Sequence, residues 1–463
     1  MHSNYSEGSL VDAEWDGMID DVFVIDRAIS NDEIQSIYGD SSHLLSLPDV
    51  AGYWSFNEGE QQILHDFSSN TNHGTIHGAT WVGSIEGCRD ELACNYDETA
   101  VISDDSCSYS CHDNGDYSLS FDGHDDFVYV GDSDILDTIS DQFSLFAEVK
   151  FSDFDSNQGY VLSKRYYSQG PGYEIRVANN ILYAEVNPGG NAITLSSPIE
   201  IDNKFHTILV TFQNNEFFRL YLDGVLVDDF GTNAIIGTNV ENFSIPSLIN
   251  NEPLVLGEFS STDGRVLNGN IKKIGILNQS LSQIDIQSLM IDNYSFTISN
   301  DLVAYYKFNS GSGNILDDYS GNSNHGTING AIWVENIYGC TDELACNYSQ
   351  TANTSDDNCD YSCHDNGDYS LSFDGADDYV LIPNDIQLHN SFSISVRFKT
   401  IDITSKFISR GGGGHYFLMM ADEKVRFHVN GTDLNSVQKF NDNNWHVATG
   451  TWDGTEMKLY VDN

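Results

Sequence analysis

The sequence is poor in basic residues: only 20 of its 463 residues are Lys or Arg, against 70 Asp and Glu. The resulting net charge of −50 at pH 7 repels phosphate backbones and anionic membrane surfaces, so nucleic acid is not an expected partner. No apolar run approaches the roughly 20 residues of a membrane-spanning helix, so we expect no membrane insertion in this segment. No Ser, His and Asp set and no Gly-rich phosphate loop is evident either. These absences exclude several large classes of enzyme and of nucleic-acid-binding or membrane protein.

What the chain does contain is a tandem repeat with a constant offset of 252 residues, the interval from Cys88 to Cys340. The same offset relates His73 to His325 and Trp81 to Trp333. A unit of this length is the size of one large domain. We expect residues 1–47 to be the C-terminal remnant of a first unit, 48–297 a complete unit with an insert at 87–113, and 298–463 a third unit, truncated at its C-terminus, with an insert at 339–365. On this interpretation the chain is a fragment, because neither end falls at a unit boundary.

All cysteines lie in the two inserts, which are dense in Cys, Asp, Asn and Ser and contain few aliphatic residues. Such segments cannot build a core and need covalent staples, and each disulfide contributes about 2–4 kcal/mol. A four-cysteine zinc site is the alternative, but the paired C-x2-C knuckles typical of zinc ribbons are missing. Two disulfides per insert are therefore expected, with the pairing left open because four cysteines allow three connectivities. The cysteines concerned are Cys88, Cys94, Cys107, Cys111, Cys340, Cys346, Cys359 and Cys363.

Outside the inserts the pattern is that of short β-strands. Residues 117–121 alternate apolar and polar side chains, and an Asp-Gly turn separates them from a second apolar run at 127–130. The Asp223-Gly224 pair between two apolar runs predicts a tight type I′ hairpin. Each unit also carries one short helix, because Ser30 with Glu33, and Ser282 with Asp285, have capping-box spacing. The expected fold is all-β, a two-sheet sandwich in each unit.

Several segments resemble bacterial laminin G-like (concanavalin A-like) jelly-roll domains, among them 51–59, 66–74, 117–123, 205–206 and 220–224. The inserts resemble the short GCTD, ACNY and DD repeats of secreted proteins of marine Bacteroidota. The resemblance implies tandem jelly-roll sandwiches, each with a short helix and a disulfide-rich insert, in a secreted or cell-surface protein. It also implies binding of glycans or surface proteins, often with calcium, but names no ligand.

The best chemical candidate is a calcium site in the loop 66–74 and its copy 318–326. Oxygen-bearing side chains stand at alternate positions there, and calcium takes 6–8 hard oxygen ligands. The candidate ligands of the two loops are Asp66, Ser68, Asn70, Asn72, Asp318, Ser320, Asn322 and Asn324. The acidic turn with Asp122 and Asp126, and its copy with Asp374 and Asp378, would supply a second arm. An ordinary Asp and Asn turn closed by side-chain hydrogen bonds is the alternative.

A ligand-binding loop is expected after residue 163, where Lys164, Tyr166 and Tyr167 offer charge and aromatic rings. Its equivalent in the third unit has Arg410, four glycines and His415. Loops that differ while the frame repeats are where specificity would lie. The alternative is that these aromatic residues are core residues or merely exposed.

Catalysis by this segment is not expected. Retaining glycoside hydrolases with a jelly-roll fold commonly carry an E-x-D-x-x-E strand, and the nearest string, Glu200-Ile201-Asp202, lacks the second Glu. The chain is therefore interpreted as a non-catalytic recognition or adhesion protein that binds carbohydrate with calcium. A protein-binding adhesin, a structural spacer and an accessory region of a polysaccharide-degrading enzyme are the alternatives.

Overall fold

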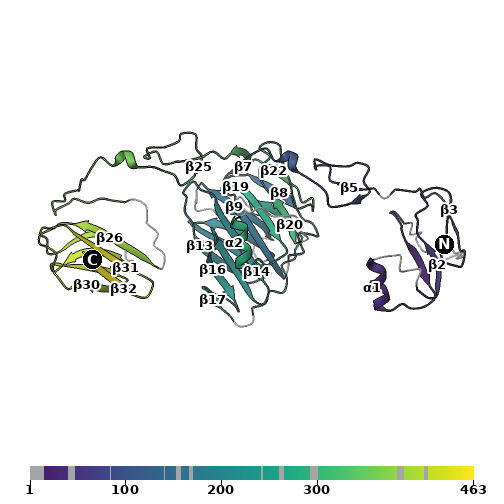
Figure 1. Cartoon of the computed structure of the whole chain (residues 1–463), viewed down its shortest axis with the longest axis horizontal. Coiled ribbons are helices and arrows are strands. Elements are labelled where there is room, and N and C mark those ends of the chain that lie inside the picture. The colour runs from purple at the N-terminus through teal and green to yellow at the C-terminus, as the bar shows by residue number, and fades with distance from the viewer. Residues whose placement is uncertain are drawn as a thin grey trace. The chain divides into compact units, whose positions relative to one another are not determined.

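The structure, a computed structural model, describes residues 15–39, 47–83, 85–139, 141–152, 158–165, 170–240, 243–259, 265–291, 301–382, 391–410 and 416–462 (Figure 1). The chain divides into two compact units, Met1–His364 and Asp365–Asn463. The first unit contains an N-terminal segment, a large β-sandwich and both cysteine-rich inserts. The second contains a smaller pair of sheets.

One sheet of the large sandwich has eight strands in the order β13-β12-β11-β10-β18-β8-β22-β21. Their bounds are β8 (Phe127–Gly131), β10 (Gly159–Arg165), β11 (Pro171–Ala178), β12 (Ile181–Pro188), β13 (Ile193–Pro198), β18 (Leu254–Leu256), β21 (Ile315–Leu316) and β22 (Gly326–Asn329). All pairs in this sheet are antiparallel. Such antiparallel pairing is typical of sandwiches built from hairpins and Greek keys.

The other sheet has nine strands in the order β17-β16-β15-β14-β9-β19-β7-β23, with β20 also paired to β19. Their bounds are β7 (Tyr117–Asp122), β9 (Gln142–Phe151), β14 (His206–Gln213), β15 (Phe217–Leu222), β16 (Val225–Gly231), β17 (Thr238–Asn239), β19 (Asn268–Leu277), β20 (Leu302–Tyr306) and β23 (Ile332–Glu335). The prediction of an all-β sandwich is confirmed, with strands at 117–122 and 127–131 where the alternation placed them.

The main core lies between the two sheets and is rich in aromatic rings. Phe143 and Phe212 are completely buried and stack at a centroid distance of 5.0 Å. Leu119 and Phe121 of β7 enter the same core at 0% and 1% exposure. Full burial of side chains of this size contributes about 1.5–3 kcal/mol each.

The sandwich extends beyond residue 297, where the sequence repeat suggested a boundary. Strands β20 to β23 follow that position, yet β20 pairs with β19, β22 with β8 and β23 with β7, while β21 pairs with β22 (Figure 1). The sandwich therefore spans residues 117–335 and takes its last four strands from the start of the next sequence repeat. The 252-residue period fixes the length of a repeat but not the residue at which a folded domain begins. That residue is determined by which strands pair, and the period does not show the pairing.

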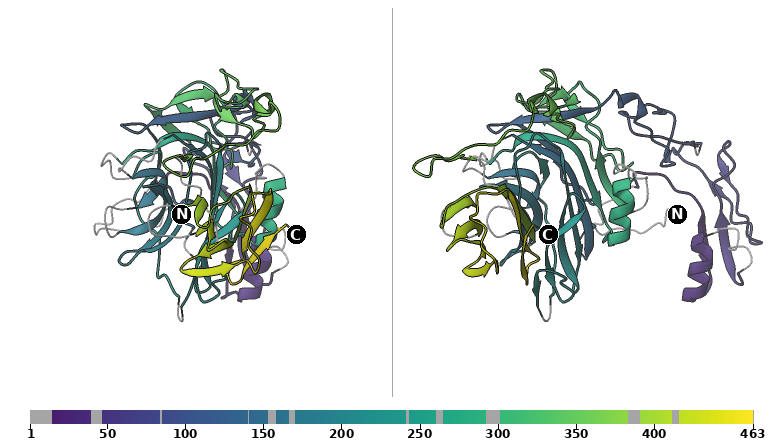
Figure 2. Two further views of the ribbon diagram at one scale, coloured as in Figure 1. Left: turned by 90° about the vertical axis from the view of Figure 1, so that its left-hand side faces the viewer. Right: turned by 60° about the vertical axis from the view of Figure 1, so that its left-hand side comes forward.

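The predicted hairpin and both capping boxes are confirmed. Asp223 and Gly224 have φ angles of 49° and 76°, as a type I′ turn requires. Helices α1 (Asn31–Gly39) and α2 (Gln283–Ile291) begin after Ser30 and Ser282, whose side chains and backbone exchange hydrogen bonds with the acidic residue three positions on. Helix α2 packs beside the nine-stranded sheet through Ile286 (Figure 2). The described residues form no helix that is long and apolar enough to cross a membrane.

The N-terminal segment, residues 15–83, holds α1 and four short strands. These are β1 (Val22–Ile25), β2 (Val50–Trp54), β3 (Ile63–Leu64) and β4 (Gly74–Thr75). They pair as two hairpin-like sheets, β1 with β2 and β3 with β4. By the 252-residue offset, they correspond to the end of β19 and to β20, β21 and β22.

The two inserts contain little regular structure. Each has one two-stranded parallel pair, β5 (Glu86–Gly87) with β6 (Ile102–Ser103) and β24 (Tyr338–Gly339) with β25 (Thr354–Ser355), followed by the short helices η2 (Ser110–His112) and η3 (Ser362–His364). All eight cysteines form disulfides, as predicted. The pairing is the same in both copies, namely Cys88–Cys107, Cys94–Cys111, Cys340–Cys359 and Cys346–Cys363.

The second unit, Asp365–Asn463, has a three-stranded sheet, β26-β31-β32, and a four-stranded sheet, β27-β28-β29-β30. Their bounds are β26 (Phe392–Phe398), β27 (Ser405–Ser409), β28 (Tyr416–Ala421), β29 (Lys424–Val429), β30 (Thr432–Asn435), β31 (His446–Trp452) and β32 (Met457–Val461). Its core is small and centres on Leu418, Phe427 and Ala448.

Candidate functional site

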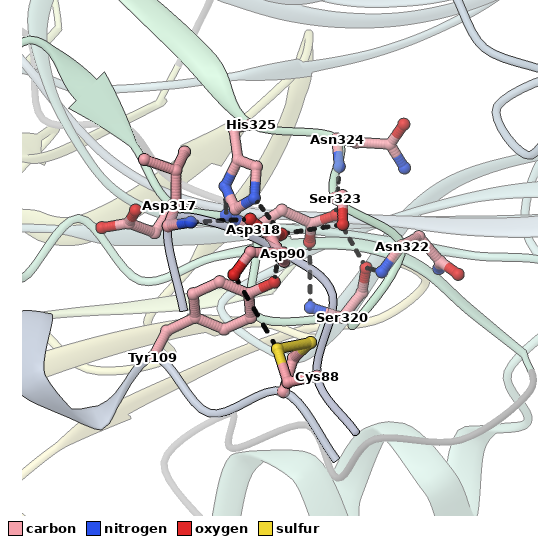
Figure 3. Close-up of polar contacts among 12 residues, drawn as sticks. Cys88, Asp90, Tyr109, Asp317, Asp318, Ser320, Asn322, Ser323, Asn324 and His325 are labelled. Carbon is pink, nitrogen blue, oxygen red and sulfur yellow. Dashed lines mark hydrogen bonds and ion pairs between the residues drawn. A yellow bond between two sulfur atoms is a disulfide. The ribbon is translucent and has the colours of Figure 1, made fainter. Parts of the chain in front are cut away.

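The Asp318 turn of the 117–335 sandwich is closed by hydrogen bonds from its own chain (Figure 3). The Asp318 side chain is fully buried, and Oδ1 accepts from the backbone N–H groups of Tyr305 (2.9 Å) and Ser320 (2.9 Å). Oδ2 accepts from the Ser320 hydroxyl (2.8 Å) and the Asn324 N–H (2.9 Å). Four donors thus point at the carboxylate where a cation would have to approach.

The asparagine side chains of this turn also form hydrogen bonds with the protein's own backbone. The side-chain amides of Asn322 and Asn324 donate to backbone carbonyls of β20. In the first copy of the loop, Asn70 and Asn72 donate to the Ala51 carbonyl of β2. Asp66 accepts the same four hydrogen bonds as its copy. In both loops this geometry favours the hydrogen-bonded turn over calcium ligation, because the donors rather than the lone pairs face inward.

The histidine of the turn links the sandwich to the cysteine-rich insert. His325 Nδ1 accepts from the Asp318 N–H (3.1 Å), a hydrogen bond within the loop. Its Nε2 lies 2.6 Å from Asp90 Oδ2 in the insert. The same Asp90 oxygen accepts from the hydroxyls of Tyr109 (2.6 Å) and Ser323 (2.7 Å) (Figure 3). Although burial raises the pKa of Asp90, these donors hold it well below its usual range.

Sequence reasoning missed this junction between insert and sandwich. Tyr109 packs on Tyr319 and His325 with ring centroids 5.6 and 5.4 Å apart, and only 3% of it is exposed. The 235 residues between Asp90 and His325 hide the contact from local patterns. The sequence offered one signal for this junction: Asp90 and Tyr109 recur as Asp342 and Tyr361 in the second insert.

The acidic turn after β7 is the better candidate for a cation. Carboxylate oxygens of Asp122, Asp125 and Asp126 lie within 4.8 Å of one another, and those of the copy Asp374, Asp377 and Asp378 do the same. Burial, and then the charges of Asp122 and Asp125, raise the pKa of Asp126. Three hard oxygen donors that repel one another at this separation fit a divalent cation such as calcium.

Lys164 does not meet the expectation of a ligand-binding side chain. A bulge between Tyr160 and Leu162 sets the parity of β10 so that Lys164 points inward, and it is 1% exposed. Its ammonium lies 2.7 Å from Asp132 and 3.1 Å from Asp137 and donates to two backbone carbonyls. It therefore closes one end of the core and is not available to a ligand.

Of the other residues predicted to bind ligand, the structure describes only Arg410. Tyr166, Tyr167 and His415 lie outside the described residues. Arg410 is exposed, and its backbone N–H donates to the carbonyl of Tyr416 (3.3 Å). Tyr173, which follows the loop in the sequence, is a core residue at 1% exposure.

The bulge turns Arg165 outward, onto the outer face of the eight-stranded sheet. We use outer face for the side away from the main core. One row of directly paired residues crosses this face through all eight strands. From β13 to β21 the row is Thr194, Glu185, Glu174, Ser163, Val255, Tyr129, Thr327 and Ile315.

Charged and aromatic groups are packed together on the outer face. Arg165 forms ion pairs with both Glu174 (3.0 Å) and Glu185, and Arg176 contacts Glu174 (3.1 Å) while its guanidinium stacks 4.2 Å from the ring centre of Tyr183. Burial raises the pKa of Glu174, and the charge of Arg165 opposes that rise. Arg176 and Tyr183 remain partly exposed.

A second aromatic group lies beside the first. The guanidinium of Arg265 lies 5.3 Å from the ring centre of Tyr160 and 4.3 Å from that of Phe259. Tyr129, farther along the same face, is 48% exposed. Tyr160 and Phe259 are buried at 2% exposure, so the accessible groups of this face are Arg176, Tyr183 and Tyr129. The buried ion pairs beneath them hold the guanidinium of Arg176 in place.

Comparison with known proteins places this fold. No curated protein sequence matches the chain. Among solved structures, a Bacteroides ovatus protein assigned as carbohydrate-binding aligns over 48% of this chain and 60% of its own length, with 14% identity and a TM-score of 0.37. The chain therefore spans less than two thirds of that protein.

Two further structures are similar at the same level. Domains LG4-5 of the mouse laminin alpha1 chain align over 74% of this chain and 75% of their own length, with 13% identity and a TM-score of 0.28. The carbohydrate-binding module CBM40 of a Ruminococcus gnavus sialidase, bound to α2,3-sialyllactose, aligns over 37% and 95%, with 15% identity and a TM-score of 0.31. Identity this low carries no information about the ligands of the present chain.

The family model gives the assignment. The model described as Concanavalin A-like lectin/glucanases superfamily, of laminin G type, matches residues 122–287 and 374–463. These segments lie in the 117–335 sandwich and in the second unit, and together they cover more than half of the chain. The chain therefore belongs to the Concanavalin A-like lectin/glucanases superfamily and carries laminin G-like domains.

Proposed function

We propose that this chain is a non-catalytic carbohydrate-recognition protein that acts outside the cell, and that the 117–335 sandwich holds a glycan on its outer face. The observation that carries the proposal is the partly exposed pair of Arg176 on β11 and Tyr183 on β12. Sugar rings have apolar faces that pack on aromatic side chains, and their hydroxyls accept from guanidinium groups and donate to carboxylates. Tyr183 and Arg176 offer both kinds of contact in one place.

The ion pairs of the outer face favour binding over hydrolysis. Glu174 and Glu185 are direct cross-strand partners, and one guanidinium, that of Arg165, contacts both. A glycosidase needs one carboxylic acid free to protonate the leaving group and a second carboxylate free to attack or to activate water. Glu174 and Glu185 are also buried, so their role is to hold the arginines in place.

An extracellular location is supported by the disulfides. Four disulfides in two core-poor inserts persist only in an oxidising compartment. The net charge of −50 favours neutral rather than acidic glycans, because like charges repel.

The test is a glycan array probed with the intact chain, followed by titration of any hit against variants. Tyr183→Ala and Arg176→Ala should each weaken binding about tenfold or more, the loss of roughly 1.4 kcal/mol of contact. Tyr96→Ala is the matched control, since Tyr96 is 42% exposed but lies in the insert. Absence of any saturable hit, or equal losses for Tyr183→Ala and Tyr96→Ala, would favour the adhesin or spacer alternatives.

Calcium forms a separate part of the proposal. We assign it to the turn with Asp122, Asp125 and Asp126, where it would screen three adjacent carboxylates and fix the loop between β7 and β8. An ion that binds only the folded state stabilises it by about 2.7 kcal/mol at a hundredfold excess over Kd. The assay is thermal unfolding in EDTA and in millimolar calcium. A rise of several degrees in Tm that Asp125→Asn abolishes and Asp318→Asn leaves intact is expected; no shift, or one that Asp125→Asn leaves unchanged, rules the site out.

A further inference from the structure

The hairpin of β28 and β29 in the second unit corresponds to the hairpin of β11 and β12 in the 117–335 sandwich. Both turn through two residues with left-handed φ angles, 52° and 62° at residues 179–180 and 54° and 69° at residues 422–423. The preceding strands, β10 and β27, each contain a bulge. Each residue of the first hairpin therefore has a counterpart in the second, at an offset of 243 residues.

The outward side chains of the two hairpins keep the same cross-strand pairing but differ in chemistry. In the sandwich, Glu174 pairs with Glu185, and two arginines contact both carboxylates. In the second unit the corresponding pair is Phe417 and His428. Their rings stack with centroids 4.2 Å apart and planes 2° apart. A cluster of buried ion pairs is thus replaced by a flat pair of rings, which we call the platform.

The platform lies on the side of its sheet that faces away from the core. Leu418 and Phe427, which follow Phe417 and precede His428 along their strands, are completely buried in the core of the unit. Successive side chains of a strand point to opposite faces of the sheet. Strand parity therefore turns the platform outward, and both of its rings are partly exposed.

Hydrogen bonds hold the histidine ring of the platform in place. His428 Nδ1 lies 2.6 Å from Asp433 Oδ1, and Nε2 accepts from the Gly431 N–H at 3.1 Å. Both contacts lie in the plane of the imidazole, so they fix its orientation and leave its faces to stacking. A rigid ring pair of this kind offers flat apolar surface at little cost in side-chain entropy.

The sheet that carries the platform is locally basic. The charged side chains of β27 to β30 are three basic residues and one acidic residue, a formal charge of +2 within a chain of −50. By contrast, the ion-pair cluster of the sandwich has two arginines and two glutamates. The acidic turn at residues 422–423 lies at the far end of the hairpin from Phe417, and its Glu423 pairs with Lys439. The four charged residues of the sheet are Lys406, Lys424, Arg426 and Asp433.

Two of these cations border the platform. Lys406 Nζ lies 5.9 Å from the centre of the Phe417 ring. Arg426, two residues before His428 on the same side of β29, donates from Nε to Asn435 (2.8 Å) and pairs through Nη1 with Asp433 (3.3 Å). These contacts position the guanidinium without using all of its five N–H donors.

We propose that this side of the second unit binds a carboxylate-bearing oligosaccharide, a polymer of uronic acid. The inference rests on the proposed function for its ligand class, carbohydrate, and adds a second site with a different charge preference. The apolar face of one sugar ring packs on Phe417 and His428, and carboxylates of the polymer pair with Arg426 and Lys406. Repulsion by the net charge of −50 is screened beyond about 8 Å at physiological salt, so the adjacent cations set the preference.

Calorimetric titration of the full chain with oligogalacturonate tests the charge preference. The matched probe is the methyl ester of the same oligomer, which keeps the sugar rings and lacks the carboxylate charge. Saturable binding of the acid is expected, with affinity that falls as NaCl rises and that is at least about tenfold weaker for the ester. No saturable binding of the acid, or equal affinity for acid and ester, overturns the inference.

Variants locate the site. Arg426→Gln and Lys406→Gln each remove one cation from a side chain that is at least partly exposed, so neither change threatens folding, and each should weaken binding about fivefold or more. Phe417→Leu keeps apolar volume, removes the ring and should have a similar effect. Lys458→Gln is the matched control, an exposed lysine of β32 in the other sheet of the unit, and should bind as wild type. Equal losses for Lys458→Gln and Arg426→Gln contradict the assignment.

The site on the 117–335 sandwich is read separately with Tyr183→Ala. This change should leave the affinity for oligogalacturonate unaltered, because Tyr183 belongs to the other site. A loss as large as that of Arg426→Gln would place the acidic oligosaccharide on the sandwich and overturn the inference. Failure of the array to yield a glycan sensitive to Tyr183→Ala would instead refute the site proposed on the sandwich and leave the titration of the platform to be decided by its own variants.

Discussion

His206 should make the stability of the 117–335 sandwich fall as pH rises from about 6.5 to about 9. Its Nδ1 lies 2.8 Å from Asp223 Oδ2 and its Nε2 3.1 Å from Asp202 Oδ1. Both ring nitrogens therefore face carboxylates, which suits the doubly protonated imidazolium. Burial lowers the pKa of His206, but the two carboxylates outweigh burial and raise it from 6.5 to about 9.

The sign and size follow from linkage. A group whose pKa is higher in the folded state stabilises the fold fully below its unfolded pKa, and this contribution is lost as pH rises through the folded pKa. A shift of about 2.5 units at 1.36 kcal/mol each is worth about 3 kcal/mol. For a domain of this size that corresponds to roughly 6–10 °C in Tm. The contact also fixes Asp223, the first residue of the β15 to β16 turn, so the loss acts on the hairpin directly.

Scanning calorimetry of the full chain at pH 6 and pH 9.5 is the assay. The wild-type transition of the sandwich should fall by that amount between the two pH values, and His206→Gln should have a low Tm at pH 6 and little further change. His446 makes the same two contacts, with Asp442 and Asp462, in the other unit, so His206→Gln isolates the sandwich. A pH dependence that His206→Gln leaves unaltered would refute the assignment.

Two further predictions concern buried charges. Asp90→Ala removes two hydrogen bonds between insert and sandwich, from Ser323 and His325, and one within the insert, from Tyr109. Trypsin should therefore cleave after Arg89 faster than in wild type, whereas Asp342→Ala, its exposed copy, should not alter that cleavage. Equal effects of the two changes would contradict the junction. Lys164→Met leaves Asp132 and Asp137 without their ammonium partner and should destabilise the sandwich by about 3–5 kcal/mol in thermal unfolding. Lys204→Met, at a half-buried surface pair with Asp202 and Asp357, should cost about 1 kcal/mol or less, and a comparable loss for both lysines would argue against the buried role of Lys164.

Local features of this fold could be predicted from the sequence, because the residues that determine them are close in the chain. The alternation in β7, the Asp-Gly hairpin and the two capping boxes each depend on fewer than ten consecutive residues. The disulfides followed from composition, although their pairing needed the three-dimensional arrangement. The limits of the sandwich could not be predicted, since β7 takes its neighbours from residues 268–271 and 332–335.

The candidate sites show why ligand residues are harder to predict. The Asp66 and Asp318 loops have the side chains of a calcium loop, but a turn uses the same oxygens, and only the direction of the backbone N–H groups separates the two. Lys164 was expected in a binding loop because the bulge before Leu162, which sets the parity of β10, leaves no mark in the sequence. The carboxylates of Asp122 and Asp126 could be predicted to lie close together because these residues are neighbours in the chain, and a cation there stays a prediction.

The central claim, that the outer face of the eight-stranded sheet is the carbohydrate-binding surface, is tested most directly by hydrogen–deuterium exchange of the intact chain with and without a saturating glycan identified on the array. We expect slower exchange in peptides that cover β10, β11 and β12, and no change in those that cover β14, β15 and β16 of the opposite sheet. Protection confined to the opposite sheet, or no protection within residues 159–188 under saturating glycan, would contradict it.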